Sequence, residues 1–152
     1  MNVLAIDPAY GRSKSASQTG LALFRDKKLT HYGYLSPAEV YTVRIKWLRR
    51  ADQLVIEDQF FGGNPAVMKG LVEAKCLWTV AALDRGIPVA ELSPAEWQRA
   101  VCRNWTFGKG SKKDPAAIEQ FVRGRWSLTD RLTPDELSAI AMGTAWMDMV
   151  IP

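Results

Sequence analysis

The placement of five short apolar segments most constrains the fold of this chain. Three follow one another directly, at residues 2–7, 20–25 and 28–35, and two more, at 53–58 and 87–92, alternate with helical segments. They are rich in Val, Ile, Leu, Phe or Tyr and are bounded by turn and cap residues, which is typical of strands. Consecutive strands favour an antiparallel meander, and strands separated by helices favour parallel pairing through right-handed crossovers. We therefore expect an α/β fold with one mixed five-stranded sheet and helices on both of its faces.

Cap chemistry marks the starts of five helices. Three share one pattern, Ser-Pro-Ala-Glu at 36–39 and 93–96 and Thr-Pro-Asp-Glu at 133–136. In this pattern a capping Ser or Thr precedes Pro at the first helical position, and Glu follows three residues after the cap. The other two helices begin at Asn64 and Asp114, each followed by Pro. The expected helices span about 36–50, 64–85, 93–102, 114–126 and 134–149.

Composition and charge narrow the class of protein. The chain has 152 residues, of which 47% are apolar and 24% charged, so we expect one globular domain over residues 1–152. Lys and Arg outnumber Asp and Glu by 20 to 16, which suits a polyanionic partner if the basic residues cluster. No apolar run approaches the ~20 residues of a membrane span. The start "MNVLAIDPAYG" also lacks the features of a signal peptide, so a cytoplasmic protein with no membrane partner is expected.

The two cysteines, Cys76 and Cys102, both fall inside expected helices and have no Cys-x-x-Cys or histidine companion. This arrangement supports neither a zinc site nor a disulfide framework. We expect both to be buried, reduced thiols.

Two acids lie where open α/β sheets bind ligands. Asp7 ends the first strand and Glu57 ends the fourth, and in a sheet of this order these strands are expected to be neighbours. Carboxylates on strand ends about 5 Å apart repel one another unless a cation lies between them. Oxygen ligands without His or Cys favour Mg²⁺ or Mn²⁺ over zinc. An Asp before Pro is also a common turn former, so a turn is the competing interpretation of Asp7. Asp58 should point to the opposite side of its strand from Glu57.

A third acid, Asp135, is distinguished by comparing the three helix starts. Glu136 matches Glu39 and Glu96 and is explained by capping, whereas Asp135 occupies the position of Ala in the other two starts. Capping therefore does not require Asp135, and we expect it to be a metal ligand. Ser138, three residues later, shares its helix face. The small residues of "SAIAMGTA" should let this helix lie close against the sheet.

In order and spacing, these segments resemble the RuvC-type Holliday-junction resolvases of the ribonuclease H-like nuclease superfamily. "VLAIDPAYG" resembles the first strand of that family with its catalytic Asp, and "LVIEDQFFGGNPAVMKGLVEA" resembles its acidic strand end and long helix. "GKGSKKDPAAIEQFV" resembles its basic loop and helix, and "TPDELSAIAMG" its last catalytic helix. The resemblance covers nearly the whole chain.

This resemblance implies a ribonuclease H-like fold and a structure-selective endonuclease that makes paired nicks in four-way DNA junctions during recombination and repair. It implies two Mg²⁺ ions per active site, with Mn²⁺ as a substitute, and a homodimer formed through the 64–85 helix. The catalytic and metal-binding residues would be Asp7, Glu57 and Asp135. The family places a second acid three residues further along the last helix, where this chain has Ser138. Ser138 is then either a weakened ligand or a packing residue, and Glu136 either compensates or only caps.

DNA contacts are expected from loops. Phe60 matches the family position of an aromatic that stacks on unpaired bases at the crossover. Basic loop residues would contact phosphates, with solvated loop charge as the alternative interpretation. These residues are Arg12, Lys14, Lys109, Lys112 and Lys113.

Two other functions remain compatible with the residues. The same acids would serve a related ribonuclease H-like nuclease that acts on flaps, forks or RNA–DNA hybrids. The substitution at Ser138 also leaves open a non-catalytic junction-binding module.

Overall fold

The computed structural model describes residues 1–9, 18–58, 64–102 and 114–151. Its five strands are β1 Asn2–Asp7, β2 Thr19–Arg25, β3 Lys28–Leu35, β4 Gln53–Glu57 and β5 Val89–Leu92. They form one sheet with the order β3-β2-β1-β4-β5. The strands β1, β2 and β3 are antiparallel neighbours, whereas β1 pairs with β4, and β4 with β5, in parallel. The mixed sheet expected from the sequence is therefore confirmed, including the adjacency of its first and fourth strands.

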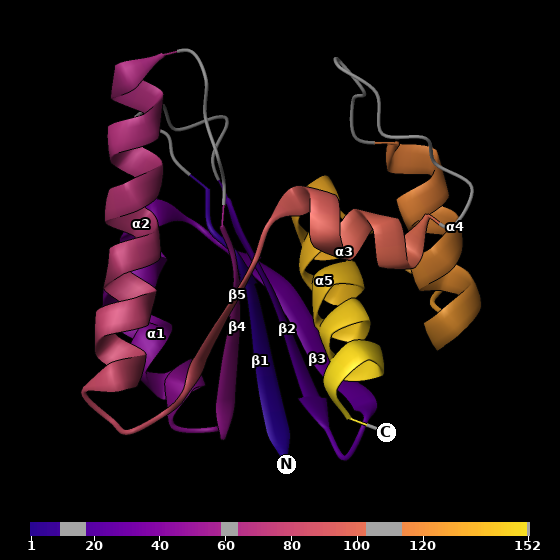
Figure 1. The fold of residues 1–152 in the computed structure, drawn as a ribbon, viewed down its shortest axis with the longest axis horizontal. Coiled ribbons are helices and arrows are strands. Elements are labelled where there is room, and N and C mark those ends of the chain that lie inside the picture. Colours follow the sequence, from indigo (N-terminus) through magenta and orange to yellow (C-terminus); the bar gives the residue numbers. More distant parts are fainter. Residues whose placement is uncertain (10–17, 59–63, 103–113, 152) are drawn as a thin grey trace.

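Helices cover both faces of the sheet (Figure 1). On one face lie α1 (Pro37–Leu48) and α2 (Pro65–Leu83). The other face carries α3 (Pro94–Val101), α4 (Pro115–Trp126) and α5 (Pro134–Val150). None of the helices in the described part of the chain is long and apolar enough to cross a membrane.

The predicted capping boxes begin three of these helices. At the start of α5, the backbone N–H of Thr133 donates to Oε2 of Glu136 at 2.7 Å, and the backbone N–H of Glu136 donates to Oγ1 of Thr133 at 3.2 Å. The same reciprocal pair begins α1 and α3. Each box satisfies backbone donors that the first turn of a helix leaves without partners.

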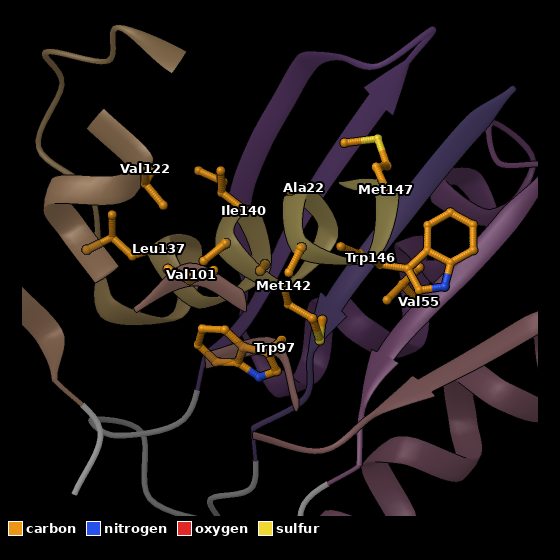
Figure 2. Close-up of a cluster of buried hydrophobic side chains, with 14 of the residues drawn as sticks. Ala22, Val55, Trp97, Val101, Val122, Leu137, Ile140, Met142, Trp146 and Met147 are labelled. Carbon is orange, nitrogen blue, oxygen red and sulfur yellow. The ribbon is translucent and has the colours of Figure 1, made fainter. Parts of the chain in front are cut away.

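The sheet separates two apolar cores, and alternation along each strand decides which core a side chain enters. In β1, Ala5 belongs to the core beneath α3, α4 and α5, whereas Leu4 and Ile6 belong to the core beneath α1 and α2. Figure 2 shows the first of these cores, in which side chains of α3, α4 and α5 meet those of the sheet. Because side chains two residues apart share a face, the strand ends inherit their orientation from these core positions.

The helix α5 packs closely against β1 and β2 because it offers small residues at the contact. A Cβ on Gly143 would lie 2.4 Å from Cε2 of Phe24 and 2.8 Å from Cβ of Ala5. The close approach predicted from "SAIAMGTA" is confirmed.

The two cysteines differ in their burial. Cys102 is buried, as expected, but Cys76 is exposed, so the prediction of two buried thiols is wrong for Cys76. Cys76 lies four residues from Val72 and from Val80, on the outward side of α2, whereas Trp78 on the inward side is fully buried. A helix against a sheet buries only one side, and this geometry overrides the general preference of cysteine for the interior.

Candidate active site

The carboxyl ends of β1 and β4 place Asp7 and Glu57 beside one another. The parallel register pairs Ile6 with Ile56, so the two acids follow at the same level on strands that lie about 4.8 Å apart. Both follow the residue alternation onto the face covered by α5, because the residues two positions earlier belong to that core. Asp7 is only 6% exposed and Glu57 only 4%. Two buried carboxylates on neighbouring strand ends favour a cation between them.

Gly20 leaves room for the third acid, Asp135, at the same level of the sheet. It is the direct partner of Asp7 in the β1–β2 ladder. A Cβ on Gly20 would lie 2.0 Å from the backbone oxygen of Asp135 and 3.1 Å from Cβ of Asp135. Only glycine leaves room for the first turn of α5, which therefore rests on β2 opposite Asp7. Asp7, Glu57 and Asp135 thus come from three elements to the same end and the same face of the sheet.

The two further candidates on α5 have different surroundings. Glu136 forms the capping box with Thr133, which confirms its predicted role as a cap. Ser138 lies one turn beyond Asp135 and is 1% exposed. A buried hydroxyl on the helix face of Asp135 is compatible both with a weak ligand and with a packing residue, and its ligand role stays a prediction.

Glu57 has a hydrogen-bond partner on α3. Nε1 of Trp97 donates to Oε1 of Glu57 at 3.0 Å, and the side chain of Trp97 is fully buried. The site residues predicted from the sequence do not include Trp97. The sequence did carry a signal, because "SPAEW" begins a helix directly after Leu92, and Leu92 is the β5 partner of Glu57.

Asp58 faces away from this group, as predicted. Nζ of Lys75 on α2 lies 2.6 Å from Oδ1 of Asp58 and 2.6 Å from Oε2 of Glu91. Burial lowers the pKa of Lys75, but the hydrogen bonds and negative charges of the two carboxylates outweigh burial and raise the pKa. This ion triad ties α2 to the ends of β4 and β5. It lines a cavity of about 260 Å³ that Glu57 also lines.

The donor set of Asp7, Glu57 and Asp135 is all carboxylate, which suits a hard divalent cation such as Mg²⁺. Among the described residues, no group of three or more Asp, Glu, His or Cys side chains lies close enough together to hold a metal ion without rearrangement. The three acids nevertheless fit metal binding, because they lie at the same end and on the same face of the sheet. Asp7 and Glu57 are also buried, and a cation offsets the repulsion between buried carboxylates.

The residues predicted to contact DNA lie outside the described part of the chain. They are Arg12, Lys14, Phe60, Lys109, Lys112 and Lys113.

Comparisons with known proteins agree with this arrangement. The chain is 27% identical to "Crossover junction endodeoxyribonuclease RuvC" of Thermotoga petrophila, over 96% of this chain and 90% of the relative. The enzyme of the same name from Thermotoga maritima is also 27% identical, over 96% of this chain and 89% of its own length. The resemblance to the RuvC-type resolvases is confirmed. No family model matches the chain.

Solved RuvC structures have the same fold. The structure described as T. thermophilus RuvC in complex with Holliday junction substrate matches with a TM-score of 0.72 and 21% identity, over 95% of this chain and 92% of that one. A second Thermus thermophilus RuvC structure matches with a TM-score of 0.67 over the same shares of the two chains. The predicted ribonuclease H-like fold is confirmed.

Proposed function

We propose that residues 1–152 form a single RuvC-like nuclease domain that resolves four-way DNA junctions in the cytoplasm by metal-dependent phosphodiester hydrolysis. The observation that carries the proposal is the convergence of Asp7, Glu57 and Asp135 at one end and one face of the sheet. The curated relatives, named as crossover junction endodeoxyribonucleases, and the likeness to a RuvC bound to a Holliday junction support it.

The order of the strands supports a different role for each acid. Asp7 lies between the other two, next to Glu57 on β4 and opposite Gly20, on which the Asp135 turn rests. Asp7 would therefore hold both of two Mg²⁺ ions, or Mn²⁺ in their place, while Glu57 and Asp135 would each hold one. When bound, such ions lower the pKa of the attacking water and offset the charge that develops on the phosphate.

The protein contributes rigidity and restricted solvent access at these acids. Both strand acids are at least nine-tenths buried, so their charges interact through a medium that screens less than bulk water. The capping box fixes the first turn of α5 and so the backbone that carries Asp135. With Ser138 in place of a second acid on this helix, one ion would be held by fewer protein carboxylates and more water.

A homodimer through the 64–85 helix would provide the two active sites that paired nicks require. The outward side of α2 supports this proposal, because large apolar side chains are about half exposed along it. These are Met68, Val72, Val80 and Leu83.

Loss of cleavage with retention of DNA binding in Asp7→Asn tests the active site. Replacing one carboxylate removes a metal ligand without removing positive charge, so binding to a synthetic four-way junction should persist while cleavage with Mg²⁺ or Mn²⁺ disappears. Asp58→Asn is the matched control, since Asp58 faces Lys75 rather than the other acids, and it should retain cleavage. Unchanged cleavage by Asp7→Asn would remove the assignment of the acids.

A substrate panel tests the choice of junction. Four-way junctions, forks, flaps, RNA–DNA hybrids and linear duplex should be incubated with the wild-type protein, and the products should be resolved strand by strand. Paired nicks near the crossover are expected. Equal cutting of linear duplex would contradict junction selectivity, and structure-selective binding without nicking under any metal condition would identify a non-catalytic binding module.

A further inference from the structure

We propose that Trp97 is a positioning residue that holds Glu57 for metal binding through one oxygen, and so helps to determine which divalent cation the site accepts. The inference rests on the proposed metal site and adds a residue that acts on it through Glu57.

The geometry of the contact supports a positioning role. The indole N–H of Trp97 donates to Oε1 of Glu57 at 3.0 Å, and neither side chain is more than 4% exposed. A hydrogen bond to a charged acceptor in a dry environment is stronger than one at the surface. It therefore restricts rotation of the carboxylate and leaves Oε1 less able to bind a cation.

The indole is anchored by its own helix and by the core that surrounds it. Its helix, α3, begins with the capping box of Ser93 and Glu96 directly after β5. The ring belongs to the buried core that α3 shares with α4 and α5, which Figure 2 shows. A donor fixed in this way can hold an acceptor in one orientation, as partners of metal ligands do in established metal sites.

Fixing one oxygen favours some cations over others. Mg²⁺ requires nearly ideal octahedral geometry and commonly takes one oxygen from each carboxylate, whereas Ca²⁺ accepts more ligands and often binds both oxygens. A Glu57 with Oε1 engaged by Trp97 is poorly arranged for binding a cation through both oxygens. Trp97 should therefore favour Mg²⁺ and Mn²⁺ over Ca²⁺.

The second core supplies a matched control. Trp78 on α2 is also fully buried, and its indole N–H has no hydrogen-bond partner among the described residues. Trp97→Phe and Trp78→Phe remove the same atoms from equally buried sites. Only the first substitution removes a contact with Glu57.

The experiment measures Mn²⁺ binding by electron paramagnetic resonance and Ca²⁺ binding by calorimetry, without DNA. Relative to the wild-type protein, Trp97→Phe should bind Mn²⁺ about tenfold more weakly. Its affinity for Ca²⁺ should change less, so that the preference for Mn²⁺ declines. Trp78→Phe should lower the melting temperature and leave the preference unchanged. An unchanged preference in Trp97→Phe, or an equal decline in Trp78→Phe, would overturn the positioning role.

A double-mutant cycle with Glu57→Gln tests whether Trp97 acts through Glu57. If it does, Trp97→Phe should change Mn²⁺ binding little once Glu57 is already replaced. If Trp97→Phe does not fold, the indole N–H signals of the ¹⁵N-labelled wild-type protein show whether metal binding changes the surroundings of Trp97. The Trp97 signal should shift on addition of Mg²⁺ while the Trp78 signal stays, and a Trp97 signal that does not move would refute the inference.

The outcomes separate this inference from the proposed function. A wild-type protein that shows the Trp97-dependent metal preference but leaves junctions intact would contradict the proposed function alone. A protein that cleaves junctions while Trp97→Phe keeps the wild-type metal preference would contradict the inference alone.

Discussion

Replacing Gly20 with Ala should disturb the active site more than it disturbs folding. The added Cβ would lie 2.0 Å from the backbone oxygen of Asp135. Carbon–oxygen contacts are normally no shorter than about 3.3 Å, so the first turn of α5 has to move by roughly 1 Å or more. Overpacking of this kind costs about 1–3 kcal/mol of unfolding free energy. A displacement of about 1 Å can lower the rate of a positioned reaction roughly 100-fold, and here it moves Asp135 away from Asp7.

Two measurements separate the loss of folding stability from the loss of cleavage rate. Urea denaturation gives the stability loss, and single-turnover cleavage of a four-way junction, at a protein concentration that saturates the DNA, gives the rate for the folded protein. Gly124→Ala on α4 is the neutral control, because its Cβ meets nothing within 4 Å, and it should stabilise the helix by up to about 1 kcal/mol.

Gly143→Ala is the second comparison. Its added Cβ would clash with Phe24 and Ala5 and push α5 away from the sheet, about two turns from Asp135. It should therefore lower stability but reduce cleavage less than Gly20→Ala does. If Gly20→Ala cleaves as fast as Gly143→Ala at equal stability, the close contact at Gly20 does not position Asp135, and the reasoning is refuted.

Three further predictions concern stability and reactivity. Thr133→Ala removes the side-chain half of the α5 capping box and should lower the unfolding free energy by about 1 kcal/mol in urea denaturation, and a change near zero would show that the cap is dispensable. The raised pKa of Lys75 means that its ion pairs stabilise the fold fully below its usual value of 10.5 and lose that contribution as the pH rises through the raised pKa. Lys75→Met should therefore flatten the decline of the melting temperature above pH 10.5, and a wild-type pH profile in this variant would contradict the assignment. In dilute, monomeric protein iodoacetamide should modify exposed Cys76 quickly and Cys102 slowly, because burial raises the pKa of the Cys102 thiol, whereas the proposed dimer through α2 would cover Cys76; equal rates by peptide mass spectrometry on the monomer would contradict this.

The ends of the helices and strands were predictable because their causes are local. A Ser or Thr cap, a Pro and a Glu within four residues form a capping box wherever the chain permits a helix, and all three such boxes are present. The face of each strand-end acid was predictable for the same reason, since alternation along β1 and β4 is a property of the strand itself. Comparison of the three helix starts also distinguished Asp135 from Glu136, whose capping role is confirmed.

Other features depend on packing between distant segments. The exposure of Cys76 follows from the side of α2 that the sheet leaves uncovered, which composition does not determine. The hydrogen bond from Trp97 to Glu57 joins residues 40 positions apart, and it forms because β5 places the start of α3 next to the end of β4.

By itself, the sequence determined the order of the elements, their caps and the acids suited to a divalent cation, because hydrogen bonding and side-chain periodicity act over a few residues. Only the tertiary structure decided how closely these acids meet and what holds them. The first turn of α5 rests on Gly20, and the indole of Trp97 reaches Glu57, because two helices from later in the chain pack on one face of the sheet. Such contacts depend on the relative positions of whole elements, and no local pattern specifies those positions.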